Sequence, residues 1–371
     1  MTILLFILFS CIYCIDGYGS LKNENGNKSA ISILSKRAIC LKPGEEFILK
    51  ANLGERFVGI DKIDWISTDP GIVSLDSKTD SSVQIKALKL GQCNIKIFAD
   101  RRQIASCRII VDNDGIIKIL AIGNSFSEDA LEGYLFDIMN GEGINVVIGN
   151  MYIAGCSLER HWNNALEDRS EYNYRKIVNG IKKERENVRL SQAIVDEDWD
   201  YISFQQASHF SGMYTTFEMY LPLLVEYVKG KNDNRNTQYV LHQTWSYANN
   251  STHDGFMNYN NDQRKMYKDI VTSISKSANL AGIEIVVPVG TAVQNGRTSF
   301  IGDNFCRDGY HLDYQIGRYT ASCTWAAELF GLNITSSHFI PTSLTLEEIL
   351  VARFSAYYAI KNPNEITTLA Y

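Results

Sequence analysis

This 371-residue chain contains a serine, a histidine and an aspartate that could act as a nucleophile, its general base and the carboxylate that orients the base. Ser125 lies in Gly123-Asn124-Ser125, between an apolar run and a helix-like stretch. Asp308 and His311 are three residues apart, so one helical turn is expected to place them on the same side. A histidine oriented by a carboxylate can deprotonate serine, which is otherwise a weak nucleophile. Ser125 could instead merely cap the helix, and an Asp-x-x-His pair alone is common.

The elements that must position these residues follow from alternating apolar runs and helix-like stretches after residue 115. Buried strands are expected at residues 117–123, 146–153, 201–204, 239–241 and 283–289. The segments between them, such as 128–140 and 217–228, are long enough for helices. This alternation predicts a three-layer, flavodoxin-like α/β domain with a parallel sheet. The active site of such a sheet lies at the carboxyl ends of its strands, where Ser125 is expected.

Residues 30–113 have a different pattern. Short segments, including 47–51, 83–87 and 94–98, mostly alternate apolar with polar residues and are separated by turn residues. This pattern predicts a small all-β sandwich. The phrases PGE at 43–45 and WISTDP at 65–70 resemble bacterial Ig-like domains of group 2. That resemblance implies a spacer or adhesion module, with ligand binding as the alternative.

The α/β segment carries five phrases in a recognisable order: IGNSFSEDALE, IAGCSLERH, QQASHFSG, HQTWSYA and RDGYHL. Together they resemble the SGNH (GDSL-type) serine hydrolases, and most closely a bacterial branch long catalogued as a domain of unknown function. The resemblance covers about residues 115–340. It implies that Ser125 is the nucleophile, that Asp308 and His311 complete a catalytic triad, and that the reaction is esterase-type acyl transfer. It also implies that Gly155 contributes a backbone amide to the oxyanion hole.

The third sequence block of this family is altered. Its usual Gly-x-Asn-Asp is missing, and the expected strand ends in QQASH at 205–209. A glutamine amide can donate to an oxyanion as the family's asparagine does. Gln206 is favoured as this donor, and Gln205 and His209 are the alternatives. The two glutamines could instead form a buried amide network with a purely structural role.

Two further residues are expected to line the cleft. Trp245 follows the fourth expected strand and His161 follows Gly155, so both could contact substrate; simple core packing is the alternative for each. Cys156 and Cys306 flank the oxyanion glycine and Asp308, and a bridge between them is left open.

The amino terminus resembles an export signal. Residues 1–19 contain an apolar stretch too short to span a bilayer and end in small residues, and residues 20–29 form a polar linker. We therefore expect a secreted, periplasmic or cell-surface protein, either soluble or lipid-anchored. The net charge of −6 argues against nucleic-acid binding, and the lack of a Cys-x-x-Cys after the signal argues against a zinc site of the usual cysteine spacing. An acyl-serine mechanism needs no metal or organic cofactor, so none is expected.

These features predict a signal peptide (1–19), a linker (20–29), an Ig-like sandwich (30–113), an SGNH hydrolase domain (115–345) and a C-terminal helical tail (346–371). The predicted function is that of an exported serine esterase acting through an acyl-Ser125 intermediate on acylated carbohydrate or another small ester. The Ig-like domain could associate with the cell surface. The alternatives are a non-catalytic glycan-binding protein and a lipase or arylesterase of the same mechanism.

Overall fold

The computed structural model describes residues 34, 38–51, 53 and 62–370. The expected signal peptide and linker lie outside the described residues. The first described unit is a β-sandwich built from a four-stranded sheet, in the order β1-β7-β6-β3, and a three-stranded sheet, in the order β2-β5-β4. Its strands are β1 (Ala38–Leu41), β2 (Glu46–Lys50), β3 (Ile63–Ser67), β4 (Val73–Asp76), β5 (Ser82–Ala87), β6 (Gly91–Ala99) and β7 (Arg102–Val111).

Apolar residues mostly alternate with polar residues along the strands, and the apolar side chains form the core of the sandwich. Residues of β6 are alternately buried and partly exposed along its whole length, as the sequence pattern predicts for a half-buried strand. Their apolar side chains pack around Trp65, which is 2% exposed. The expected two-sheet sandwich is therefore present, while its identity as an Ig-like domain stays a prediction.

The second unit is a mixed α/β domain around a seven-stranded sheet in the order β11-β10-β9-β8-β12-β13-β14. The five expected strands are all present, and neighbouring pairs among them run parallel. They are β8 (Ile117–Gly123), β9 (Val146–Tyr152), β12 (Tyr201–Phe204), β13 (Gln238–His242) and β14 (Ile285–Val287). Every residue of β8 is buried, as expected for a strand covered on both faces.

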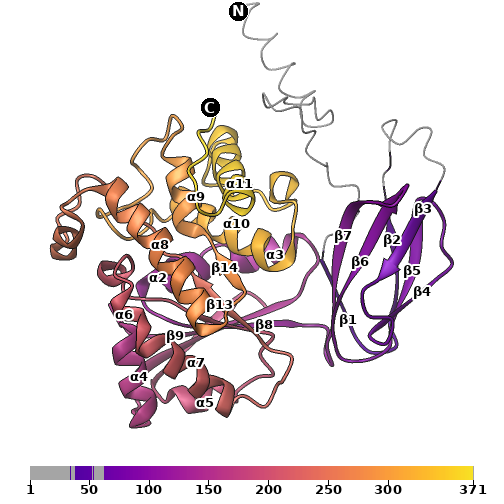
Figure 1. Ribbon diagram of the computed structural model, residues 1–371, viewed down its shortest axis with the longest axis horizontal. Coiled ribbons are helices and arrows are strands. Elements are labelled where there is room, and N and C mark those ends of the chain that lie inside the picture. Colours follow the sequence, from indigo (N-terminus) through magenta and orange to yellow (C-terminus); the bar gives the residue numbers. More distant parts are fainter. Residues whose placement is uncertain (1–33, 35–37, 52, 54–61, 371) are drawn as a thin grey trace, which may run out of the picture.

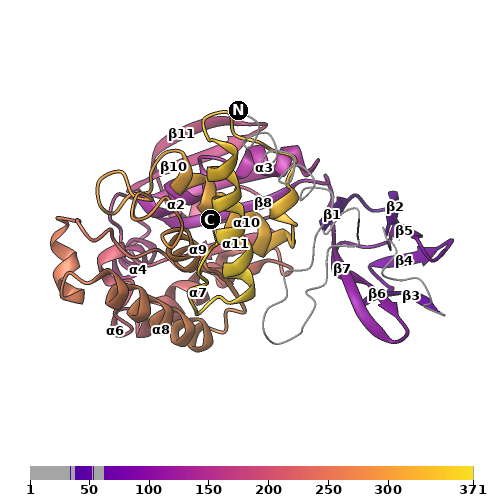
Figure 2. The same cartoon turned by 90° about the horizontal axis from the view of Figure 1, so that it is seen from above.

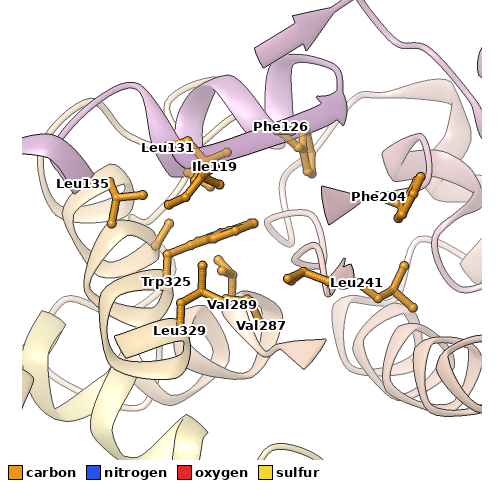
Figure 3. Packing of buried hydrophobic residues seen from close by; sticks show 14 of the residues in the cluster. Ile119, Phe126, Leu131, Leu135, Phe204, Leu241, Val287, Val289, Trp325 and Leu329 are labelled. Atoms are coloured by element: carbon orange, nitrogen blue, oxygen red, sulfur yellow. The ribbon is translucent and has the colours of Figure 1, made fainter. Parts of the chain in front are cut away.

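Two layers of helices cover this sheet (Figure 1). One layer contains α2, α3, α9, α10 and α11, and the other contains α4, α5, α7 and α8. Their bounds are α2 (Ser125–Leu131), α3 (Leu135–Gly141), α4 (Leu158–Leu166), α5 (Leu190–Ile194), α6 (Thr215–Glu218), α7 (Tyr220–Lys231), α8 (Gln263–Ala281), α9 (Val289–Gly296), α10 (Ile316–Phe330) and α11 (Leu346–Lys361). Figure 3 shows Trp325 of α10 packed close to Ile119 of β8 and Leu131 of α2.

Two parts of the α/β domain, a hairpin and the last helix, differ from the sequence-based expectation. The strands β10 (Tyr172–Val178) and β11 (Ile181–Val188) form an antiparallel hairpin that extends the sheet beyond β9. Seven of the eight β11 residues are exposed and mostly charged, so this edge strand has no apolar pattern from which to predict it. The helix α11 packs on α9 and α10 and adds Ile349 and Ala352 to the main core, so it is part of the α/β domain.

The sandwich meets the α/β domain near the amino end of the central strand β8 (Figure 2). Arg108 of β7 donates to the Tyr201 hydroxyl, at 3.3 Å, and to the Leu329 carbonyl. Lys118 of β8 forms ion pairs with Asp112 and Asp114 of the connecting segment. Ser125 follows the carboxyl end of β8, so the sandwich and the candidate site lie at opposite ends of this strand.

Within the described residues, no helix combines the length and apolarity needed to cross a membrane. Likewise, the described part of the chain brings together no group of three His, Cys, Asp or Glu residues that could hold a metal ion.

Candidate active site

Ser125 is the first residue of α2 and is separated from the end of β8 by one residue, Asn124. The helix cap is Asn124, whose side-chain oxygen accepts from Phe126 N at 3.0 Å. A side chain at Gly123 would stand 2.4 Å from Ser127 Oγ, so the tight turn requires glycine. Because Asn124 caps the helix, the Ser125 hydroxyl is left for another partner.

That partner is His311. Its Nε2 lies 2.9 Å from Ser125 Oγ, and its Nδ1 lies 2.6 Å from Asp308 Oδ2. With the Nδ1–H donating to the carboxylate, Nε2 carries the lone pair that can accept the serine proton. The structure thus brings together the three residues predicted as a triad, in the order and at the distances that the chemistry requires.

The pair does not lie on a helical turn, contrary to the sequence-based expectation. Residues 306–312 form a tight loop. It is closed by an isolated antiparallel β-bridge, a backbone pairing, between Cys306 and Leu312, and by Arg307 N donating to the His311 carbonyl at 2.9 Å. Gly309 has φ +91°, which favours glycine. Asp308 Oδ1 accepts from His311 N at 2.8 Å, so the carboxylate orients both the backbone and the ring of the same histidine.

The electrostatics favour an ionised Asp308. Burial alone would raise the pKa of this carboxyl, but hydrogen bonds from the His311 ring and from the backbone N–H groups of His311 and Tyr310 outweigh burial and lower it. The carboxylate therefore stays available to hold the imidazole in the tautomer described above.

A second carboxylate, Asp129, links the nucleophile helix to the triad loop. It lies one helical turn after Ser125 and is fully buried. Its oxygens accept from Leu312 N at 2.8 Å, from Arg307 at 3.0 Å and from Arg318 at 2.7 Å. Burial raises the pKa of Asp129, while Arg318 and Arg307 oppose that change. Arg307 and Leu312 flank the Asp308–His311 segment, so this single carboxylate fixes both ends of that segment to α2.

Trp245 supports the same loop from inside the core. It is fully buried, stacks on Phe126 with ring centroids 4.1 Å apart, and donates from Nε1 to the Tyr310 carbonyl at 2.7 Å. The prediction that Trp245 contacts substrate is therefore wrong for this structure. The ring is covered on all sides because it packs between the nucleophile turn and the triad loop.

His161 is also buried and does not line the cleft. Its Nδ1 lies 3.0 Å from the Tyr172 hydroxyl, and its ring stacks on the Tyr172 ring. Burial lowers the pKa of His161 to about 3, with a smaller contribution from Arg160. The expectation of a substrate-binding role is wrong, because α4 turns this side chain toward the hairpin strand β10.

Gly155 has the backbone expected of an oxyanion-hole glycine. Its φ is +60°, the residue is exposed, and no atom lies within 4 Å of the place where a side chain would begin. Asn124 Nδ2 donates to the Cys156 carbonyl at 3.0 Å, which ties the Gly155 turn to the Ser125 turn. An oxygen of a substrate could therefore approach this backbone closely.

Gln206 is not free to act as the side-chain donor. Its Oε1 accepts from Leu158 N at 2.9 Å and Ala207 N at 2.8 Å, and its Nε2 donates to the Thr216 carbonyl and hydroxyl at 3.1 and 3.0 Å. These bonds employ both ends of the amide. The expectation that Gln206 holds the oxyanion is corrected to a structural role: it joins the end of β12 to α4 and α6.

Gln205 belongs to a buried amide network, which is the structural role considered above for Gln205 and Gln206. It donates to Asn124 Oδ1 at 2.7 Å, and its Oε1 lies 2.9 Å from His242 Nδ1. Burial lowers the pKa of His242 to about 3, so the ring is neutral near pH 7. Gln205 thereby braces the cap of the nucleophile helix, and its own amide points to Asn124.

The six cysteines after the expected signal are all free thiols in the described chain: Cys40, Cys93, Cys107, Cys156, Cys306 and Cys323. The bridge between Cys156 and Cys306 that the sequence left open is not formed. Cys156 is buried, and burial raises the pKa of its thiol to about 12.

Sequence reasoning missed Asp129 and the two arginines that bind it. A weak indication was available for one of them, because Arg307 directly precedes Asp308. Nothing in the sequence showed that these distant residues would meet.

The fold and the site define a mixed α/β protein with a serine–histidine–aspartate set at the carboxyl edge of its sheet. Residues 118–359 match the family model described as domain of unknown function DUF4886. The chain belongs to this family. It is 48% identical to a DUF4886 family protein from Bacteroides uniformis of known crystal structure, with a TM-score of 0.68; the match covers 68% of this chain and 98% of that one.

More distant structures are also similar in part. A putative SGNH hydrolase from Slackia heliotrinireducens is 18% identical, with a TM-score of 0.41 over 58% of this chain and 99% of that chain. A Geobacillus acetyl-xylooligosaccharide esterase is 12% identical, with a TM-score of 0.39 over 57% of this chain and 93% of that one. No curated protein matches the chain.

Proposed function

We propose that this protein is an SGNH-type serine hydrolase that cleaves carboxylic esters. The observation that carries the proposal is the unbroken hydrogen-bond chain from Ser125 Oγ through His311 to Asp308, at 2.9 and 2.6 Å. Helix capping does not explain it, because Asn124 provides the cap.

In the first half of the reaction, Ser125 Oγ attacks the ester carbonyl carbon while its proton passes to His311 Nε2. A carbon–oxygen bond forms to the serine, and the carbonyl oxygen becomes an oxyanion. When the oxyanion collapses, the bond to the alcohol oxygen breaks, and His311 returns the proton to that oxygen. The alcohol leaves, and an acyl-Ser125 ester remains.

In the second half, His311 removes a proton from water as the water oxygen attacks the acyl carbon. The bond to Ser125 Oγ then breaks, the serine regains its proton, and a carboxylic acid is released. Asp308 holds the imidazole through both halves and stabilises its charged form.

Backbone amides hold the oxyanion in this proposal. The Ser125 N–H belongs to the first turn of α2, where N–H groups have no partner within the helix and the dipole favours negative charge. Gly155 supplies the second N–H from a turn that is tied to the first by the Asn124–Cys156 hydrogen bond. The commitment of Gln206 to Thr216 and Leu158 supports a site that relies on these amides.

The finer parts of the proposal are an acyl ester on carbohydrate as substrate, and export to the periplasm, cell surface or medium, with the sandwich as a spacer. The proposal is tested by incubating the purified protein with p-nitrophenyl acetate and with acetylated polysaccharide and measuring nitrophenol and acetate. Release of both supports an esterase. No release from either would favour a non-catalytic glycan-binding protein, and release of nitrophenol alone would favour an arylesterase or lipase.

A further inference from the structure

Three half-buried rings, those of His209, His253 and Tyr310, lie beside the triad and take no part in the chemistry described above. They come from different loops: His209 from η2 (Ser208–Phe210) after β12, His253 from the segment before η3 (Asp254–Tyr259) after β13, and Tyr310 from the triad loop. We call these three residues the ring wall. All three loops follow strand ends or carry the triad, so the wall borders the candidate active site.

The ring wall is continuous with the catalytic imidazole. The centroid of the Tyr310 ring lies 4.1 Å from that of His311, the His253 ring lies 4.8 Å from Tyr310, and the His209 ring lies 5.8 Å from His253. The buried Tyr247 ring packs behind it, 4.9 Å from His253 and 5.7 Å from Tyr310.

Close backbone packing holds the wall in place. The His209 carbonyl accepts from Asn258 Nδ2 at 2.9 Å and from the Tyr259 hydroxyl at 3.1 Å. A side chain at Gly255 would stand 2.2 Å from His209 Cβ, so η3 lies directly against η2. A preformed surface of this kind loses little freedom when it binds a ligand.

The polar edges of the rings are available. His253 Nδ1 accepts from Gly255 N at 2.9 Å, so in the neutral ring the proton is on Nε2, which can donate. Across the described residues, no hydrogen bond forms at His253 Nε2, at either ring nitrogen of His209, or at the Tyr310 hydroxyl. The wall therefore offers flat ring surfaces together with donors and acceptors at their rims.

The direction of proton transfer indicates which part of an ester meets this wall. His311 must give its proton to the departing alcohol oxygen, so the alcohol portion of the substrate lies next to the His311 ring. An apolar alcohol would cover the polar rims without giving them partners, which is costly. A sugar has both apolar ring faces and hydroxyl groups, and so matches both properties.

We propose that His209, His253 and Tyr310 form the subsite for a sugar ring on the alcohol side of the ester. This inference rests on the proposed function and specifies its substrate class. A site built to bind hydroxyl groups discriminates strongly against an analogue that lacks them. The ring wall should therefore determine the preference for a sugar ester over an ester of a cyclic alcohol that has no further hydroxyl groups.

The test compares two acetate esters with six-membered alcohol rings: a mono-acetylated methyl xylopyranoside and cyclohexyl acetate. The wild type should show a kcat/KM at least tenfold higher for the sugar ester. Tyr310→Phe and His209→Phe keep a ring but remove its polar rim, and each should lower the ratio of the two kcat/KM values by about tenfold. His338→Phe is the matched control, because His338 is exposed and pairs with Glu142 away from the wall; its ratio should equal that of the wild type.

A wild-type ratio near one, or a ratio that both variants leave unchanged, would overturn the sugar subsite while leaving the esterase proposal standing. An equal loss on both esters would also overturn it, because the wall would then act by positioning His311. If the wild type hydrolyses neither ester and Ser125 does not react with a fluorophosphonate, the proposed function itself fails, and the subsite fails with it.

Discussion

Removing the negative charge of Asp129 should damage both stability and turnover. This carboxylate is fully buried and accepts from Arg307, Arg318 and Leu312 N at 2.7–3.0 Å. Asp129→Asn leaves two guanidinium groups without their buried counter-charge. Breaking a buried ion pair by removing one partner costs about 3–5 kcal/mol. We expect the free energy of unfolding to fall by that amount.

The loss of turnover follows from geometry. Asp129 fixes the residues on both sides of the Asp308–His311 segment to the helix that begins with Ser125. A displacement of about 1 Å between catalytic groups can cost roughly 10²-fold in rate. At a temperature where the variant is folded, kcat for p-nitrophenyl acetate should fall by about that factor, with KM changed little, because the altered contacts are not with substrate.

The matched control is Glu128→Gln. Glu128 neighbours Asp129 on α2 and pairs with Arg175 at 2.9 Å and Arg318 at 3.6 Å, but it makes no ion pair with the triad loop. Urea unfolding and steady-state kinetics of both variants separate general destabilisation from triad positioning. If folded Asp129→Asn retains the wild-type kcat, the positioning role is refuted. If Glu128→Gln lowers kcat equally, loss of charge on α2 is the cause instead.

Three further changes have distinct expected results. Asp308→Asn should lower kcat by about 10⁴-fold through the wrong His311 tautomer, as the same change does in chymotrypsin-type proteases; a loss below tenfold in steady-state kinetics would contradict this role. Gln206→Ala should lower the free energy of unfolding by about 1–3 kcal/mol or more, because buried partners lose their hydrogen bonds, while kcat of the folded protein stays near the wild-type value; a selective fall in kcat would restore Gln206 as an oxyanion donor. Burial raises the pKa of Asp200 to about 7; the charges of Asp112 and Asp114 add to this rise, and Lys118 opposes it. The folded state therefore binds this proton more tightly than the unfolded state and loses stability as pH rises from about 4 to 7. Asp200→Asn should therefore raise the free energy of unfolding by roughly 2 kcal/mol at pH 8 and change it little at pH 4, and equal effects in urea unfolding at both pH values would contradict this.

The strands were predictable because each depends on a local pattern, and the triad was predictable because the phrases around Ser125 and around Asp308 and His311 resemble those of the SGNH hydrolases. Apolar runs such as 117–123 indicate buried strands, and the turn after that run places Ser125 at the sheet edge. Asp308 and His311 lie in one short loop, so their pairing needs little tertiary information. The hairpin formed by β10 and β11 was missed because its outer strand is almost entirely exposed and charged.

Long-range contacts account for the errors at the site. Trp245 and His161 follow or adjoin strand ends, which favoured a place in the cleft, but their rings pack against Phe126 and Tyr172 from remote segments. Gln206 was chosen for its amide, yet that amide is taken by Thr216 and Leu158. Residue type and position along the chain do not show which partner a buried polar group will find.

The central claim is that Ser125 is an activated nucleophile. Its most direct test is intact-mass analysis of the full chain after reaction with a fluorophosphonate, with peptide mapping of the modified site. The account predicts one adduct per wild-type chain, located on Ser125, no adduct on folded Ser125→Ala, and much slower labelling of His311→Ala, which lacks the base 2.9 Å from Ser125 Oγ. An equal adduct on folded Ser125→Ala, or no labelling of the wild type, would contradict it.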